Sequence, residues 1–90
     1  MTKMTLQNES ITEYPFDPAE LTRRGVVVMG EGTIEVVTPN SRIPLRFRFR
    51  RTRNLDHKAR RLHMISGPST DLYPSEYRKA RKWADDNLPR

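Results

Sequence analysis

Residues 42–53 read Arg-Ile-Pro-Leu-Arg-Phe-Arg-Phe-Arg-Arg-Thr-Arg, and the fold can be worked out from this stretch. Apolar side chains occupy the odd positions from Ile43 to Phe49, and arginines occupy the even positions from Arg46 to Arg50. A period of two is typical of a half-buried β-strand, because alternate residues point to opposite faces of a sheet. We therefore predict a strand with one face in the core and a row of guanidinium groups, about 6.8 Å apart, on the other.

Two details of the pattern refine this prediction. Pro44 lies near the start of the strand and has no N–H to donate to a neighbour, which favours an edge position in the sheet. Phe47 and Phe49 could stack on bases, as aromatic residues of sheet-based RNA binders do. Because they share a face with Ile43 and Leu45, we assign them to the core instead.

The composition limits the chain to a few classes of protein. Its 90 residues are 34% hydrophobic, which is enough for one modest core and too little for two. The absence of cysteine excludes a disulfide framework and a Cys-based zinc site, and it favours a reducing compartment such as the cytoplasm. No apolar run approaches the ~20 residues of a membrane span, and the N-terminus lacks a signal-peptide pattern, so we expect a soluble, unexported protein.

The chain is basic, and its charge is unevenly distributed. The formal net charge is +6. Residues 1–41 carry three Lys or Arg against six Asp or Glu, a net of −3, whereas residues 42–90 carry fourteen against five, a net of +9. Within residues 42–61, nine basic side chains accompany a single acid. A local excess of this kind is the electrostatic footprint of a nucleic-acid binder.

The N-terminal part of the chain contains one clear local signal. Residues 1–15 are polar and show no hydrophobic period, which predicts a flexible, unfolded or loosely docked arm. Asp17 can then act as an N-cap, with Pro18 at the first helical position. We predict a short helix over residues 18–24, with Gly25 as its left-handed C-cap.

Two further strands should precede the arginine-rich one. Residues 26–29 are a continuous apolar run, which is typical of a strand that is buried on both faces in the centre of a sheet. Gly-Glu-Gly at residues 30–32 predicts a turn or a bulge, and residues 33–38 predict a second strand. A reverse turn over residues 39–41 then leads into the arginine-rich stretch, which makes an antiparallel meander the simplest topology.

The segment 54–66 fits two secondary structures. Its apolar residues share one helical face, yet those from Leu62 to Ile65 also alternate as in a strand. We favour a loop that carries Lys58, Arg60 and Arg61, followed by a short strand and a Ser-Gly-Pro-Ser turn.

The C-terminal segment predicts a helix that starts near Pro74 and stops before Pro89. Tyr73, in the preceding loop, is expected to be exposed. The apolar stripe of this helix consists of Tyr77, Ala80, Ala84 and Leu88, with Trp83 beside it.

Together these signals predict a single small α+β domain over residues 16–90. It would contain an antiparallel sheet of three or four strands, a C-terminal helix packed on one face of that sheet, and the short N-terminal helix.

The arginine-rich stretch predicts a surface for a polyanion. An exposed row of charge can simply keep sheet edges from aggregating, but ordinary edges achieve this with one or two lysines. Arginine favours bidentate contact with phosphate or carboxylate, so we predict binding to DNA or RNA, mainly through phosphates and without sequence preference. The predicted contacts are Arg46, Arg48, Arg50, Arg51, Arg53, Lys58, Arg60 and Arg61. Secondary contacts are Arg78, Lys79, Arg81 and Lys82, which could equally form a solvated helix face paired with nearby acids.

Two other functions use the same basic surface. The first is a regulatory or inhibitory protein whose basic face binds an acidic surface of another protein. The second is a structural component of a nucleoprotein assembly, in which the N-terminal arm orders on assembly.

The sequence contains no recognisable catalytic apparatus. His57 and His63 have no neighbours that resemble a metal site or a catalytic triad. The loop at residues 66–69 lacks the glycine patterns of nucleotide-binding loops. We therefore expect neither an enzyme nor a cofactor or metal site.

From Gly32 to about Trp83 the chain resembles small phage- and plasmid-encoded β-hairpin proteins of unknown function. The matching pieces are Gly32-Thr33-Ile34-Glu35-Val36-Val37, Leu45 to Arg50, Arg61 to Pro68, and Asp71-Leu72-Tyr73. The pattern differs after Tyr73, where this chain is expected to be helical rather than stranded. The resemblance implies an origin in a mobile genetic element and carries over no functional residue. For the regulatory alternative, it implies a protein of phage type, active against host defence or in host takeover, with a host protein as its partner.

Overall fold

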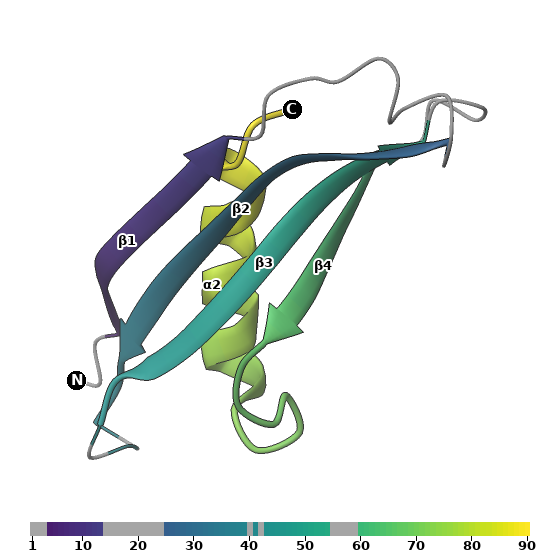
Figure 1. The fold of residues 1–90 in the computed structure, drawn as a ribbon. Helices are drawn as coiled ribbons and strands as arrows, with labels where there is room; N and C mark the ends of the chain where they lie inside the picture. The colour runs from purple at the N-terminus through teal and green to yellow at the C-terminus, as the bar shows by residue number, and fades with distance from the viewer. Residues whose placement is uncertain (1–3, 14–24, 40, 42, 55–59) are drawn as a thin grey trace.

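The computed structural model describes residues 4–13, 25–39, 41, 43–54 and 60–90. These residues form four strands and one helix (Figure 1): β1 (Thr5–Glu13), β2 (Val26–Val37), β3 (Leu45–Asn54), β4 (Arg60–Ser66) and α2 (Pro74–Asn87). The strands pair antiparallel in the order β1-β2-β3-β4, and α2 covers one face of the sheet. The predicted α+β class, the antiparallel meander and the C-terminal helix are confirmed. We call the face under α2 the helix-side face and the opposite one the open face.

The arginine-rich stretch forms β3, which is an interior strand of the sheet and not an edge strand as predicted. Pro44 precedes the first residue of the strand, so its missing N–H interrupts no ladder hydrogen bond. Ile43 also lies outside the strand and is 71% exposed, so it does not join the core. The alternation in the sequence starts at Ile43, but the strand itself starts at Leu45, where pairing with Val36 of β2 begins.

The core lies between the helix-side face and α2, and the predicted division of the two faces of β3 is confirmed. Phe47 and Phe49 are fully buried, and Tyr77 packs on both rings with centroid distances of 6.4 and 6.2 Å. Tyr73 is half-buried against this core rather than exposed, because it is the N-cap residue of the docked helix. The buried cluster consists of Ile34, Val36, Leu45, Phe47, Phe49, Ala80, Trp83, Ala84 and Leu88.

Residues 26–37 form one continuous strand, so the turn considered for residues 30–32 is wrong, although a register irregularity opposite β3 falls between Val28 and Gly30. The two glycines serve close packing instead. A Cβ atom at Gly32 would lie 2.5 Å from Leu88 Cδ2, and one at Gly30 would lie 2.5 Å from Pro89 Cδ. Glycine therefore lets the C-terminal end of α2 approach the backbone of β2.

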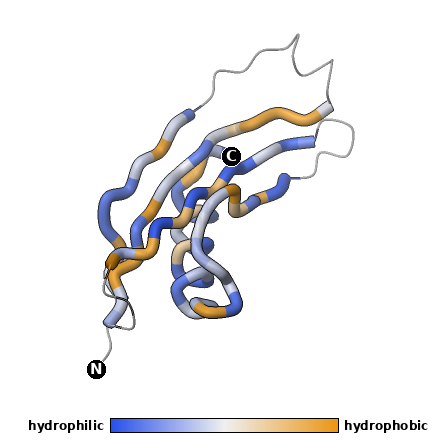
Figure 2. Tube along the Cα trace, turned by 60° about the horizontal axis from the view of Figure 1, so that its bottom comes forward, coloured by the Kyte–Doolittle hydropathy of each residue, from blue (hydrophilic) through white to orange (hydrophobic). Residues whose placement is uncertain are grey.

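The apolar start of β2 is not buried on both faces as predicted. Val26 is 42% exposed, and the next three residues are half-buried. The reason is that β1 pairs with β2 only as far as Gly30, and Pro89, just after the end of α2, also packs at this glycine. The start of β2 extends beyond both elements, and Figure 2 shows it as a hydrophobic stretch at the far end of the sheet.

Most of the predicted N-terminal arm is a strand. Thr5–Glu13 forms β1 and pairs with β2 from Val37 to Gly30, with an irregularity between Gln7 and Ser10, where Asn8 has a φ of 51°. Nearly every residue of β1 is exposed, so the strand carries no hydrophobic alternation that could have predicted it. Backbone pairing holds it, together with a hydrogen bond of 2.9 Å from Trp83 Nε1 to Glu9.

The structure confirms a strand in the ambiguous segment, because β4 spans Arg60–Ser66. Arg60 and Arg61 therefore lie on a strand rather than in the loop assigned to them. Lys58 and the predicted helix over residues 18–24 lie outside the described residues. Gly25, the predicted C-cap, has the left-handed φ of 68°.

Candidate nucleic-acid interface

The open face of the sheet carries the predicted arginine row, and the neighbouring strand supplies carboxylates to it. In the register of β2 and β3, Glu35 lies opposite Arg46 and Glu31 lies opposite Arg50. Arg46 Nη2 donates to Glu35 over 3.1 Å, and Arg48 Nη2 donates to Glu31 over 2.5 Å. Arg50 donates through Nε to the other oxygen of Glu31 over 2.6 Å. The row therefore has acidic partners within its own sheet.

These ion pairs leave the cations outermost. The side chains of Arg46, Arg48 and Arg50 are 70%, 51% and 40% exposed, whereas those of Glu35 and Glu31 are 12% and 5% exposed. Each carboxylate thus holds part of a guanidinium group from beneath, while other N–H groups remain on the solvent side. The five side chains together carry a net charge of +1, so the row is a weaker anion site than its sequence indicates.

Glu35 lies at the centre of a small polar network that spans three strands. The side-chain amide of Asn8 donates to it over 2.6 Å, Arg46 over 3.1 Å and the amide of Gln7 over 3.2 Å. The bond from Asn8, followed by those from Arg46 and Gln7, lowers the pKa of Glu35 from its usual value of 4.5. The carboxylate is therefore ionised at neutral pH and stabilises the β1–β2–β3 register.

Arg51 was predicted to contact nucleic acid, but it lies on the helix-side face and is 5% exposed. Its Nη2 donates to the backbone oxygen of Asp85 over 2.8 Å and to the Asp85 carboxylate over 3.2 Å. A cation at the C-terminal end of a helix is stabilised by the helix dipole and by the free carbonyl groups there. Arg51 is therefore a buried anchor of α2, and its place on an odd position explains why it faces inward.

Three predicted contacts gather where β3 ends and β4 begins. Arg53 lies directly opposite Arg60, and Arg61 lies opposite Thr52. Arg60 and Arg61 are exposed, and Arg53 is half-buried. Among the residues that the structure describes, none of the three has an ion pair or a side-chain hydrogen bond. We call Arg53, Arg60 and Arg61 the end cluster.

The secondary contacts lie on α2, in the other layer of the molecule. Lys82 pairs with Asp86 over 3.1 Å, which agrees with the expected pairing at helical spacing. Arg78 donates to the backbone oxygen of Pro74, and Arg81 donates to that of Leu62 over 3.2 Å. These cations and Lys79 do not join the open face.

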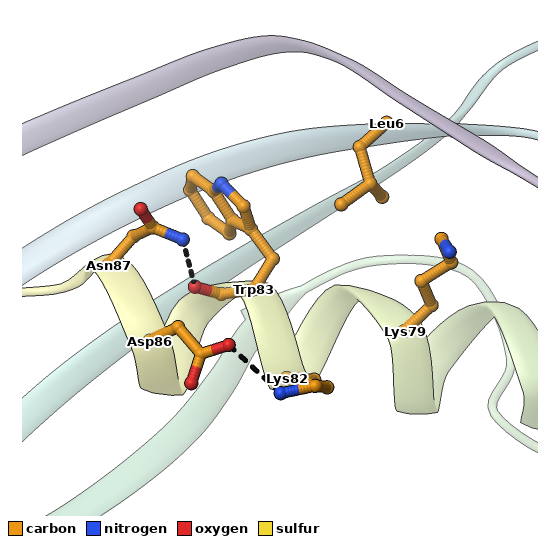
Figure 3. A pocket seen from close by; sticks show the side chains of 6 residues that line it. All are labelled: Leu6, Lys79, Lys82, Trp83, Asp86 and Asn87. Atoms are coloured by element: carbon orange, nitrogen blue, oxygen red, sulfur yellow. Dashed lines mark hydrogen bonds and ion pairs between the residues drawn. The ribbon is translucent and has the colours of Figure 1, made fainter.

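A cavity of about 280 Å³ lies between β1 and α2 (Figure 3). It is slightly smaller than the roughly 300–1,000 Å³ of typical ligand pockets. Most of its polar groups are already bonded: Lys82 donates to Asp86, and the side-chain amide of Asn87 donates to the backbone oxygen of Trp83. The described part of the chain also holds no group of three His, Asp or Glu side chains that could bind a metal ion. The lining residues are Leu6, Lys79, Lys82, Trp83, Asp86 and Asn87.

The two glutamates of the open face were not predicted as partners of the arginine row. A register argument could have found them, because Glu35 lies as far before residues 40–41 as Arg46 lies after them. The same holds for Glu31 and Arg50. A hairpin turn centred on residues 40–41 would therefore place each pair side by side. The turn at residues 39–41 was predicted. Glu31, however, was assigned to a different turn or bulge at residues 30–32, so it was not considered as a strand residue opposite Arg50.

Comparisons of the chain with protein-family models, curated proteins and solved structures find no match. The resemblance to phage- and plasmid-encoded hairpin proteins stays a prediction. Among the described elements, no helix has the length and apolar character needed to span a bilayer.

Proposed function

We propose that this protein binds nucleic acid by contacting phosphates, with the end cluster as the main contact and the open-face arginines beside it. The observation that supports this most is the cross-strand pair of Arg53 and Arg60, two cations in register with no acidic neighbour in the described residues. Like charges directly opposite each other on a sheet destabilise it. An anion that binds between them removes this repulsion, and phosphate matches the donor geometry of arginine.

The open-face row supports the same function in a different way. Its guanidinium groups are held by the carboxylates of Glu31 and Glu35, so they lose little side-chain entropy when an anion binds. They extend the cationic surface along β3 from Arg50 toward Arg46. Contacts of this kind give sequence-independent affinity that depends strongly on salt.

The test is a binding titration of labelled duplex and single-stranded nucleic acid across a salt series. If the end cluster and two open-face arginines each neutralise one phosphate, the log–log salt slope on duplex DNA should be about −4.5. A flat salt response would contradict the proposal.

An acidic protein surface could use the same cations, and one experiment separates the two partners. The tagged protein is used to capture partners from lysate with and without nuclease treatment. Nucleic acid as the direct partner predicts that co-purifying material is lost after nuclease. A stoichiometric protein partner that survives nuclease, together with no binding to purified nucleic acid, would overturn the proposal.

A further inference from the structure

We infer that the β3–β4 hairpin docks edge-first into the major groove of duplex DNA, so that its two faces contact the phosphates on the two sides of the groove. This inference rests on the proposed function and adds the substrate class and the docking mode. It comes from how the end cluster is distributed over the two faces of the sheet.

The end cluster is two-sided. Residues of β3 alternate, so Arg53 shares the helix-side face with Arg51, and its partner Arg60 lies on that face too. Arg61 is opposite Thr52, on the open face with Arg50. The described end of the hairpin therefore has cations on both faces, unlike the region from Leu45 to Arg50, where all cations are on one face.

Neither face is covered by α2 at this level. The last turn of the helix reaches Arg51, which donates to Asp85, and the residues that follow the helix, Leu88 and Pro89, pack over Gly32 and Gly30. The pairs Thr52–Arg61 and Arg53–Arg60 lie further along the strands. Figure 1 shows β3 and β4 continuing past the end of α2, and the tube in Figure 2 agrees.

Charge also changes across the sheet at this end. β2 contributes the uncharged residues Val26, Val27 and Val28 beside β3, and β1 reaches only to the level of Gly30. The cations belong to β4, the edge strand, and to β3 beside it. The edge formed by β4 is therefore the side that would face a polyanion.

The B-DNA major groove fits this arrangement. It is about 12 Å wide, it admits a two-stranded β-ribbon, and phosphate backbones flank it on both sides. The major groove of an RNA duplex is deep and narrow, and side chains do not read it. Binding of single strands relies on aromatic platforms, whereas the described aromatic residues lie in or against the core. The described aromatic residues are Phe47, Phe49, Tyr73, Tyr77 and Trp83.

The experiment compares variants of each face on defined probes. Helix-side variant R53S/R60S and open-side variant R61S are titrated with a DNA duplex across salt, with R78S as a control on the outer surface of α2. Two-sided docking predicts that the salt slope falls in magnitude by about 1.8 for R53S/R60S and by about 0.9 for R61S, and stays unchanged for R78S. Thermal unfolding checks that the variants are folded. A slope that responds to only one face would overturn two-sided docking.

The same titration tests the groove. We expect the protein to bind a DNA duplex at least about tenfold more tightly than an RNA duplex or single-stranded DNA. A difference of this size corresponds to about one phosphate contact or more that the weaker complexes lack. A duplex whose cytosines carry bulky major-groove glucosyl groups should bind more weakly, whereas the minor-groove ligand distamycin should not compete. Equal affinity for all probes, or competition by distamycin alone, would overturn the inference and leave the proposed function standing. No binding to any probe would overturn the proposed function itself.

Discussion

The two halves of β3 carry the same residue type in different surroundings. From Arg46 to Arg50 the neighbouring strand supplies the buried Glu31 and the half-buried Glu35, and the cations lie on one face above these carboxylates. Around Arg53 the neighbouring strands supply Val27 and Arg60, and the cations lie on both faces without an acidic partner among the described residues. Between the halves, Arg51 is buried and anchors the end of α2.

This difference shows that a row of arginines in a sequence does not by itself define an anion site. What each guanidinium group can bind depends on the residues that the register places beside it. The first half of β3 has most of its charge balanced within the sheet, whereas the end cluster has no acidic partner in the part of the chain that the structure describes. Variants of each half of β3 separate these two settings.

Charge reversal of the end cluster should have the largest effect on binding. In R53E/R60E/R61E three phosphate contacts become repulsive, so affinity for duplex DNA at moderate salt should fall about a hundredfold or more. Fluorescence anisotropy with a labelled duplex measures this. The matched control R78E/K79E/K82E makes the same change in net charge on α2 and should lose much less. Equal losses in both variants would mean that net charge alone, and not the end cluster, determines binding.

Removal of Arg51 should affect stability instead of binding. R51A deletes charge-assisted hydrogen bonds to the end of α2 and opens space beneath it, so we expect a loss of about 2–3 kcal/mol in the free energy of unfolding. R53A should stay within about 0.5 kcal/mol of the wild-type stability. Urea unfolding and the salt slope are measured for both variants. A reduced slope for R51A at wild-type stability would place Arg51 in the interface after all.

Neutralising Glu31 tests whether the first half of β3 is internally balanced. E31Q weakens the bonds to Arg48 and Arg50, and it should cost about 1–2 kcal/mol of stability. The same change leaves one more unbalanced cation on the open face, so affinity for duplex DNA should rise. Paired urea unfolding and anisotropy measurements check both effects. Weaker binding by folded E31Q would show instead that Glu31 must position these arginines for the ligand.

The smallest effect concerns pH. The pKa of Glu35 is lower in the folded state than in the unfolded state, where it is near 4.5. The ionised carboxylate therefore contributes its full stabilisation at pH values above the unfolded-state pKa. The contribution is lost as the pH falls through the lower, folded value. Wild type should therefore unfold at a higher temperature than E35Q at pH 7, and the difference should shrink below pH 4.5. A difference that is constant across this range would contradict the assigned network around Glu35.

How far the sequence predicts the structure depends on how strongly each segment is patterned. The alternation in β3 and the apolar stripe of α2 mark buried and exposed positions clearly, and a strand and a helix form at these places, although β3 starts at Leu45 and is an interior strand. β1 could not be found in this way, because nearly all its side chains are exposed and it is held mainly by backbone pairing and by side-chain hydrogen bonds with Glu35 and Trp83. Gly30 and Gly32 suggested a turn because glycine permits one, whereas close packing of Leu88 and Pro89 explains both.

For the candidate site, the number of cations, their concentration in the second half of the chain and their division between the two faces of β3 can be read from the sequence. These properties follow from composition and from the two-residue period of a strand. The tertiary structure decided which cations are partnered: strand register brought Glu31 and Glu35 under the first half, and helix docking took Arg51 into the core. Electrostatic interactions depend on distances of a few ångströms between residues far apart in sequence, and only the folded chain sets those distances.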